Sequence, residues 1–277
     1  MDWLDALQHL RGEGTAGVLI TVIEVRGHAP REAGAKMVVS ESGTWDTVGG
    51  GNLEATVIER ARAMLAAGSS EPETLTFSLN EHATVKHSRQ CCGGVVSVLL
   101  EPQQARPTVA IFGVGHVGYE LARVMSRLPV TVHLVDSRTD QLDADRFAEV
   151  LMGTARVHLQ HSPAPETTLA ELPAGAHVLI MSHDHSEDLI LCDTALRRGD
   201  LGMVGLIGSS AKWSRFRKRL RDEGHDDAAI SRISCPIGVP GIPGKEPAAI
   251  AVSVAADLLR VFGEVRRTGS GGCSRRR

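Results

Sequence analysis

A glycine-rich turn, GVGHVG at 113–118, constrains the fold more than any other feature of this chain. It follows the apolar run TVAIF at 108–112 and opens a stretch of helical spacing at about 117–127, and the next strand, 131–135, is followed by Asp136. This order is typical of a Rossmann-like unit, in which the helix N-terminus favours an anion and the acidic residue accepts hydrogen bonds from a ribose. The other interpretation of the same glycines is close packing of helix on strand, without a ligand.

Strands and helices continue to alternate after this unit. We expect further strands at 177–181 and 202–207, and helices at about 187–198, 211–223 and 246–262. Such alternation predicts a parallel sheet covered by helices on both faces.

The first hundred residues have a different pattern. Short runs rich in β-branched residues predict strands at 17–25, 36–40, 74–79 and 95–101, and apolar residues at helical spacing predict a helix between 53 and 65. The fold class is therefore α/β, with an amino-terminal α+β domain followed by a Rossmann-like, doubly wound parallel-sheet domain. We place the domains at 1–101 and 108–265, a linker at 102–107, and a Gly/Ser/Arg-rich tail, expected to be disordered, at 266–277.

Composition excludes several classes of function. The formal net charge of -3 and the aromatic content of 3% argue against a nucleic-acid partner. The amino terminus has no secretory pattern and no run approaches the roughly 18 apolar residues that cross a bilayer, so we expect a cytoplasmic protein without a membrane partner. Five cysteines without a CxxC pair do not predict a structural zinc site.

Two loops in the first domain are candidate sites. Gly49, Gly50 and Gly51 precede the predicted helix, where their N–H groups could surround an anion, and Asn52 is a suitable N-cap. The alternative is a capped turn without a ligand. The second loop, QCCGG at 90–94, carries vicinal thiols, which are soft metal ligands and, as thiolates, nucleophiles or sulfur carriers; one of them could instead be a small core residue.

Three further segments belong to the second domain. His183 and His185 follow a predicted strand and could act as acid–base groups, cofactor contacts or metal ligands, unless Asp184 merely caps the next helix. The basic helix at 212–221 is usually a solvated face but could dock an acidic partner. The Gly/Pro loop before the last helix places Lys245 near a helix N-terminus, where an anion could bind, or else it is a rigid connection.

Six motifs occur together in an order that resembles the xanthine dehydrogenase accessory proteins, the XdhC/CoxI family. They are GGGNLE at 49–54, QCCGG at 90–94, GVGHVG at 113–118, SHDHSED at 182–188, GLIGSSAKWSRFRKRL at 205–220 and GVPGIPGKEPAAIAVSVAADLL at 238–259. The resemblance spans nearly the whole chain. It implies a maturation factor that binds the molybdenum cofactor (molybdopterin), protects it during sulfuration and inserts it into apo-xanthine dehydrogenase, with a cysteine desulfurase as second partner and a homodimer as the assembly.

Residue patterns and resemblance together give one set of candidate cofactor contacts. These are Gly49, Gly50, Gly51, Asn52, Gln90, Cys91, Cys92, Gly93, Gly94, Gly113, Gly115, Gly118, Asp136, His183, His185 and Lys245. Cys91 and Cys92 are also candidates for contact with molybdenum itself. The main alternative is an NAD(P)-dependent oxidoreductase that uses the glycine turn, although a bound nucleotide is not expected; a purely structural assembly factor is the third hypothesis.

Overall fold

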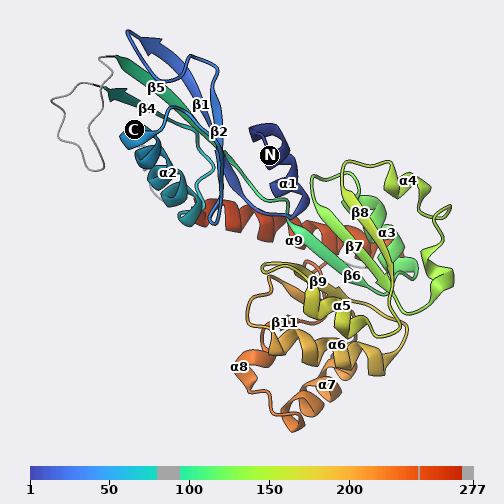
Figure 1. Cartoon of the computed structure of the whole chain (residues 1–277). Coiled ribbons are helices and arrows are strands. Elements are labelled where there is room, and N and C mark those ends of the chain that lie inside the picture. Colours follow the sequence, from blue (N-terminus) through green and yellow to red (C-terminus); the bar gives the residue numbers. More distant parts are fainter. Residues whose placement is uncertain (80–93, 243, 270–277) are drawn as a thin grey trace. The chain divides into compact units, whose positions relative to one another are not determined.

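The computed structural model describes residues 1–79, 94–242 and 244–269 (Figure 1). The chain divides into two compact units, one formed by Met1–Ala105 with the chain from Gly263 onward, the other by Arg106–Phe262. No helix in the described ranges is both long and apolar enough to span a membrane.

The first unit is built on an antiparallel sheet of five strands in the order β3-β2-β1-β5-β4. The strands are β1 Gly17–Arg26, β2 Lys36–Val39, β3 Thr44–Asp46, β4 Glu73–Ser78 and β5 Val95–Gln103. Helix α1 (Trp3–Gly12) precedes β1, and α2 (Gly51–Ala66) lies between β3 and β4. This confirms the predicted α+β arrangement, although β5 extends two residues into the expected linker because Pro102 and Gln103 pair with β1.

Helix α2 packs through the residues whose spacing predicted it. Leu53, Val57, Ala61 and Met64 are buried in one core with the inward-facing residues of β1 and β5. A smaller core forms where Ala6 and Leu10 of α1 meet Val38 of β2. The two cores lie on different sides of β2, since alternate strand residues point to opposite faces.

The second unit is a parallel sheet of six strands in the order β11-β10-β9-β6-β7-β8. The strands are β6 Thr108–Phe112, β7 Thr131–Asp136, β8 Arg156–His161, β9 His177–Ile180, β10 Val204–Leu206 and β11 Ile233–Ser234. The helical segments are α3 His116–Met125, η1 Thr139–Leu142, α4 Ala148–Leu151, α5 Pro165–Glu171, α6 His185–Arg197, α7 Ser210–Asp222, α8 Asp227–Ile230 and α9 Pro247–Gly269. Strand order reverses between β6 and β9, which confirms the doubly wound Rossmann-like fold.

Both faces of this sheet are buried, as the alternation predicted. Along β6, Val109 and Ile111 face a core with α3, α4 and α9, whereas Ala110 and Phe112 face a core with α5 to α8. The helices therefore cover the sheet from both sides (Figure 1). Helix α9 runs to Gly269, beyond the predicted domain end at residue 265.

Candidate functional site

The three glycines of the GVGHVG turn have different structural roles. A Cβ atom on Gly113, whose φ is 97°, would lie 2.3 Å from the carbonyl oxygen of Met181, so this glycine lets the ends of β6 and β9 meet. A Cβ atom on Gly118 would lie 2.3 Å from the carbonyl oxygen of Gly113, so it lets α3 pack on β6. Gly115 faces open space and is the N-cap of α3 without a side-chain hydrogen bond. Packing accounts for two of the glycines, and only the middle one leaves backbone accessible to a ligand.

Asp136 does not have the surroundings expected of a ribose contact. Its side chain is 1% exposed, and both carboxylate oxygens are engaged within the protein. Oδ2 accepts hydrogen bonds from Val114 N (2.7 Å) and Arg138 Nη2 (3.0 Å), and Oδ1 accepts from the N and Nε of Arg138 (3.0 Å each). Burial alone would raise the pKa of Asp136, but these hydrogen bonds outweigh it and hold the pKa below its ordinary value. Asp136 therefore fixes the glycine turn to the end of β7, and its contact with a ligand stays a prediction.

The histidines after β9 are exposed. Asp184 is the N-cap of α6, where its side chain accepts a hydrogen bond from Ser186 N at 2.6 Å, which confirms the predicted cap and leaves the role of the histidines a prediction. His185 packs edge-on against Phe216, with ring centroids 6.4 Å apart. His183 and His185 lie at the carboxyl edge of the sheet, but neither lines the large cavity described below.

A buried ion pair joins α6 to α7 and is hydrogen-bonded to the loops that follow β9 and β10. Lys212 Nζ lies 2.5 Å from Asp188 Oδ2 and donates a second hydrogen bond to the carbonyl of Ile207 at 3.0 Å. Asp188 is fully buried, and its Oδ1 accepts a hydrogen bond from Ser182 N at 3.0 Å. The sequence interpretation that treated Lys212 as part of a solvated face was wrong, because the lysine lies on the same side of α7 as the buried Phe216.

The glycine loop of the first unit already holds an anion, namely the chain's own Glu54. The Glu54 carboxylate accepts hydrogen bonds from the Thr47 hydroxyl, from Val48 N (3.3 Å) and from Gly50 N (3.1 Å). Gly49, Gly50 and Gly51 all have positive φ, as a backbone curled around an anion requires. The N-cap is Gly50, so the prediction that Asn52 caps the helix is wrong; Asn52 lies inside the first turn, and its Oδ1 is buried without a hydrogen-bond partner.

The cysteine motif lies largely outside the described residues: Gln90, Cys91, Cys92 and Gly93 fall in the segment 80–93. Gly94 is described, and a Cβ atom there would lie 2.3 Å from the carbonyl oxygen of His28, so it permits close backbone approach beside β1. Within the described ranges, no three His, Cys, Asp or Glu side chains are grouped closely enough to hold a metal ion.

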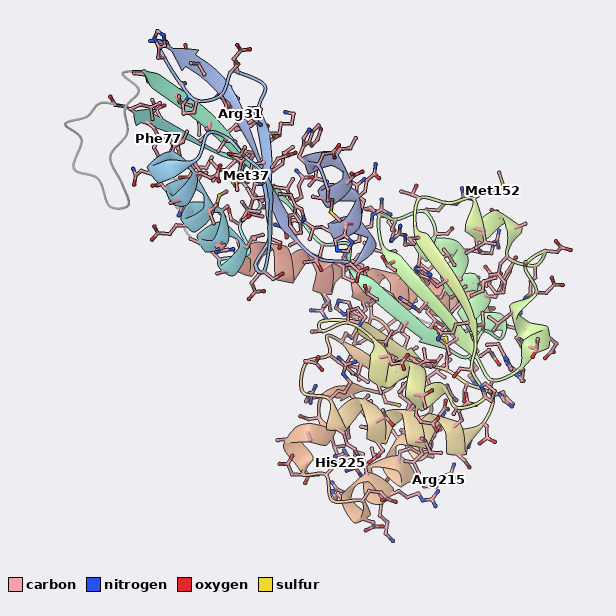
Figure 2. All side chains as sticks on the ribbon, viewed as in Figure 1. Arg31, Met37, Phe77, Met152, Arg215 and His225 are labelled. Carbon is pink, nitrogen blue, oxygen red and sulfur yellow. The ribbon has the colours of Figure 1, made fainter. Side chains whose placement is uncertain are left out.

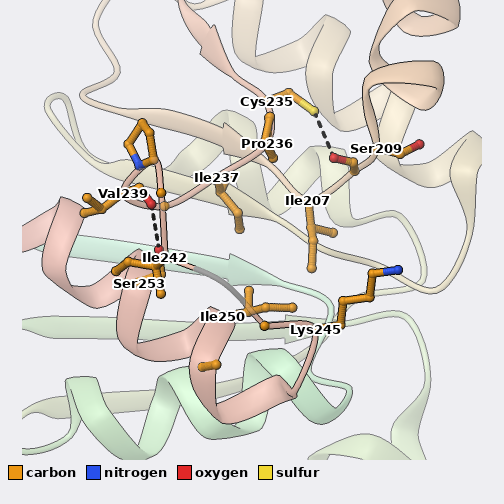
Figure 3. Close-up of a pocket in the computed structure, with 16 residues that line it drawn as sticks. Ile207, Ser209, Cys235, Pro236, Ile237, Val239, Ile242, Lys245, Ile250 and Ser253 are labelled. Carbon is orange, nitrogen blue, oxygen red and sulfur yellow. Dashed lines mark hydrogen bonds between the residues drawn. The ribbon is translucent and has the colours of Figure 1, made fainter.

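A cavity of about 820 Å³ lies at the carboxyl ends of β10 and β11 (Figure 3). Its walls come from the loop after β10, the Gly/Pro loop after β11 and the first turns of α9. Figure 3 shows Ile207, Ile237 and Ile250 around this space, with Lys245 at its edge. The lining is mainly apolar, with a few polar groups, which is the usual character of a small-molecule site.

The charge around this cavity favours an anionic ligand. Among the described residues that line it, Lys245 alone is charged, and its side chain is exposed. The N-cap of α7, Ser209, also lines the cavity, so the amino-terminal ends of α7 and α9 both lie at its wall, although one amide, Lys245 N, is engaged by the Glu246 carboxylate at 3.0 Å. The positive ends of the helix dipoles add to the lysine charge, and the neighbouring Glu246 carboxylate opposes it.

A thiol also lines the cavity. Cys235, half-buried, has its Sγ 3.8 Å from the carbonyl oxygen of Gly208, and burial raises the pKa of the thiol. Cys192 is fully buried on α6, and its pKa is raised further for the same reason. Sequence analysis missed Cys235 as a site residue. Its only signal was its position in the Gly/Pro loop that already contained Lys245.

Comparison with known proteins gives two family matches. Residues 109–258 match the XdhC Rossmann domain, and residues 10–78 match the XdhC and CoxI family. The chain is 25% identical over 240 residues to the uncharacterized protein YqeB of Escherichia coli, covering 87% of this chain and 42% of YqeB. It is 23% identical over 282 residues to the molybdenum cofactor insertion chaperone PaoD of Escherichia coli, covering 90% of this chain and 84% of PaoD.

Solved structures show weaker likenesses. A structure described as a xanthine dehydrogenase from Bacillus halodurans aligns with a TM-score of 0.48 at 18% identity and covers 95% of this chain and 96% of its own. The Escherichia coli tRNA N6-threonylcarbamoyladenosine dehydratase TcdA aligns with a TM-score of 0.41 at 13% identity, over 58% of this chain and 88% of its own. Since the Rossmann-domain match alone spans more than half of the residues, the chain belongs to the XdhC and CoxI family.

Proposed function

We propose that this protein is a molybdenum cofactor-binding chaperone, whose cargo binds in the cavity at the ends of β10 and β11. Family membership and the relative named as a molybdenum cofactor insertion chaperone support the class of cargo. The single structural observation that carries the proposal is the cavity of about 820 Å³ with Lys245 and two helix N-termini at its wall. A pterin with a terminal phosphate needs an apolar enclosure and an anion site, and this cavity supplies both.

The finer steps of the proposal concern sulfuration and delivery. The chaperone protects the cofactor while sulfur from a cysteine desulfurase is added, and then inserts it into apo-xanthine dehydrogenase, acting as a homodimer in the cytoplasm. Cys91 and Cys92 are the proposed soft contacts to molybdenum or to the incoming sulfur. Gly49 to Asn52, Gln90, Gly93 and Gly94 remain proposed cofactor contacts. At Gly50 a phosphate must displace the Glu54 carboxylate.

The glycine turn is a weaker part of the proposed cargo site. Gly115 is open to a ligand, and His183 and His185 stay proposed contacts because they are exposed at the same edge of the sheet. The oxidoreductase alternative loses its principal support, because Asp136 is committed to Val114 and Arg138.

The direct test is to purify the protein from molybdenum-replete cells and measure bound molybdenum by mass spectrometry and bound pterin by fluorescence after oxidation. We expect both in the wild-type protein and a roughly tenfold loss in Lys245→Glu, because the substitution reverses the charge beside the phosphate. Arg11→Glu is the matched control, since Arg11 is exposed on α1 in the other unit and should retain the wild-type amount.

The outcomes separate the function from the location of the site. Wild-type protein without molybdenum and pterin refutes the chaperone function. Equal retention in Lys245→Glu and wild type refutes the cavity as the site but not the function. A Cys91→Ser/Cys92→Ser variant should stay folded by circular dichroism but lose cofactor; unchanged retention together with unchanged target activation removes the proposed role of the pair.

A further inference from the structure

The exposed face of α7 carries an excess of positive charge. Of its six basic residues, Lys212 is buried against Asp188 and Arg221 pairs with Asp227 at 2.8 Å. The other four are exposed, and within the described part of the chain none forms an ion pair: Arg215, Arg217, Lys218 and Arg219. Figure 2 shows Arg215 on this exposed face.

Helix stability does not account for this charge. Arg219 and Arg221 lie in the last turn of α7, where cations interact favourably with the helix dipole. Arg215, Arg217 and Lys218 lie nearer the middle of the helix, where that benefit is absent. Arg215 lies three or four residues from other cations, and Arg217 lies four residues from Arg221. Like charges at such spacing destabilise a helix. The helix therefore retains repulsion that a bound anion would relieve.

A groove of about 400 Å³ lies beside these cations. Trp213, half-buried, and the buried Ile230 and Ile233 form its apolar part, and Arg217 and Arg221 border it. Asp227 and Ser231 complete the lining, so its only carboxylate among the described residues is the one already paired with Arg221. The groove therefore has a mainly polar, cationic lining in which Trp213 supplies the accessible apolar surface.

We propose that this groove and the adjoining cations of α7 dock an acidic segment of a partner protein that carries aliphatic side chains. Carboxylates would pair with the guanidinium groups, and an aliphatic side chain would pack against the half-buried Trp213. A protein is favoured over nucleic acid because the cations are confined to one helix of a chain with net charge -3, and apolar burial adds nothing to phosphate binding. The groove shares no residue with the cavity at β10 and β11, so the docking proposal does not depend on the proposed cargo site.

The test uses the full chain and two labelled peptides of about 12 residues, both rich in Glu and Asp, of which one contains Leu and the other has Ser at the same positions. Fluorescence anisotropy should show tighter binding of the Leu peptide, with affinity falling as ionic strength rises. Arg217→Glu/Lys218→Glu should weaken binding by roughly tenfold or more, about 1.4 kcal/mol. Arg11→Glu/Arg62→Glu changes the net charge equally at exposed sites of the other unit and should leave affinity within about twofold.

Three results would overturn the docking surface. An equal loss of peptide affinity in the two double variants would show that the peptide is attracted only by the net charge of the protein. Equal affinity for the Leu and Ser peptides would remove the groove from the interaction, and tighter binding of a single-stranded oligonucleotide of matched charge would assign the face to nucleic acid. Arg217→Gln, which is milder, repeats the test if circular dichroism shows that the double variant is unfolded. Molybdenum retention in Arg217→Gln should equal wild type, so failure here leaves the chaperone proposal intact.

Discussion

The buried pair between Asp188 and Lys212 gives the sharpest prediction for the scaffold of the site. Lys212→Met removes the ammonium group that lies 2.5 Å from Asp188 Oδ2 and 3.0 Å from the Ile207 carbonyl. The carboxylate of Asp188, fully buried, then retains only its hydrogen bond from Ser182 N. Removal of one partner of a buried ion pair lowers the free energy of unfolding by about 3–5 kcal/mol. The hydrogen bond that the Ile207 carbonyl loses accounts for roughly 1 kcal/mol of this.

We expect Lys212→Met to lower the free energy of unfolding by about 3–4 kcal/mol, because the carboxylate of Asp188 is left buried without its cationic partner.

Urea unfolding of the full chain at pH 7, followed by far-UV circular dichroism, measures this loss of stability. Lys218→Met is the matched control because Lys218 is exposed on the same helix, and it should change stability by less than about 0.5 kcal/mol. A loss of less than about 1 kcal/mol would refute the assignment of a structural ion pair. Lys212→Met should also loosen the wall of the cavity, because Ile207 lines it.

Further predictions concern the same unit. Burial and the neighbouring His158 lower the pKa of His133 to about 4, so the unfolded chain binds the extra proton between about pH 6.5 and pH 4, and stability falls with pH in that window. Urea unfolding at pH 7 and pH 5 measures how much stability the wild-type protein loses on acidification. His133→Gln should reduce that loss by about 1–2 kcal/mol, a range lowered to allow for the partial exposure of the ring. An unchanged pH dependence in this variant would contradict the role of His133. Gly118→Ala should lower the free energy of unfolding by about 1–3 kcal/mol, because the added Cβ atom would meet main-chain atoms. Gly115→Ala should lower it by less than about 1 kcal/mol. Similar melting temperatures for the two variants would argue against the packing role of Gly118.

The architecture of both units could be predicted from the sequence, because the residues whose spacing indicated a strand or helix are the ones that the structure buries. The apolar run at 108–112 was predicted as a strand with the bounds that β6 has, and every residue of it is buried. The helix at 51–66 was predicted from apolar spacing that the structure places in one core. By contrast, α1 and β3 were not predicted, since α1 mixes polar and apolar residues and β3 has only three residues.

The site residues were harder to predict from the sequence, because the partners of a side chain depend on tertiary packing. Lys212 was assigned to solvent by its cationic neighbours, but its partner Asp188 comes from another helix, which no local pattern shows. Asp136 was expected to face a ligand, yet Arg138, two residues away, turns back onto it. Asn52 was expected to cap α2, but the helix begins earlier, after Gly50 with its positive φ. The Glu54 side chain accepts the hydrogen bond from Gly50 N.

The contact of Gly113 with Met181 limits where this domain can accept a new side chain. The two strands on either side of the reversal in strand order touch through backbone atoms, since a Cβ atom on Gly113 would lie 2.3 Å from the Met181 carbonyl oxygen. No side chain can be added at Gly113 without moving main chain. Variation of the proposed cargo site is therefore expected at the walls of the neighbouring cavity, where the side chains of Ile207, Ile237 and Ile250 can be exchanged one by one.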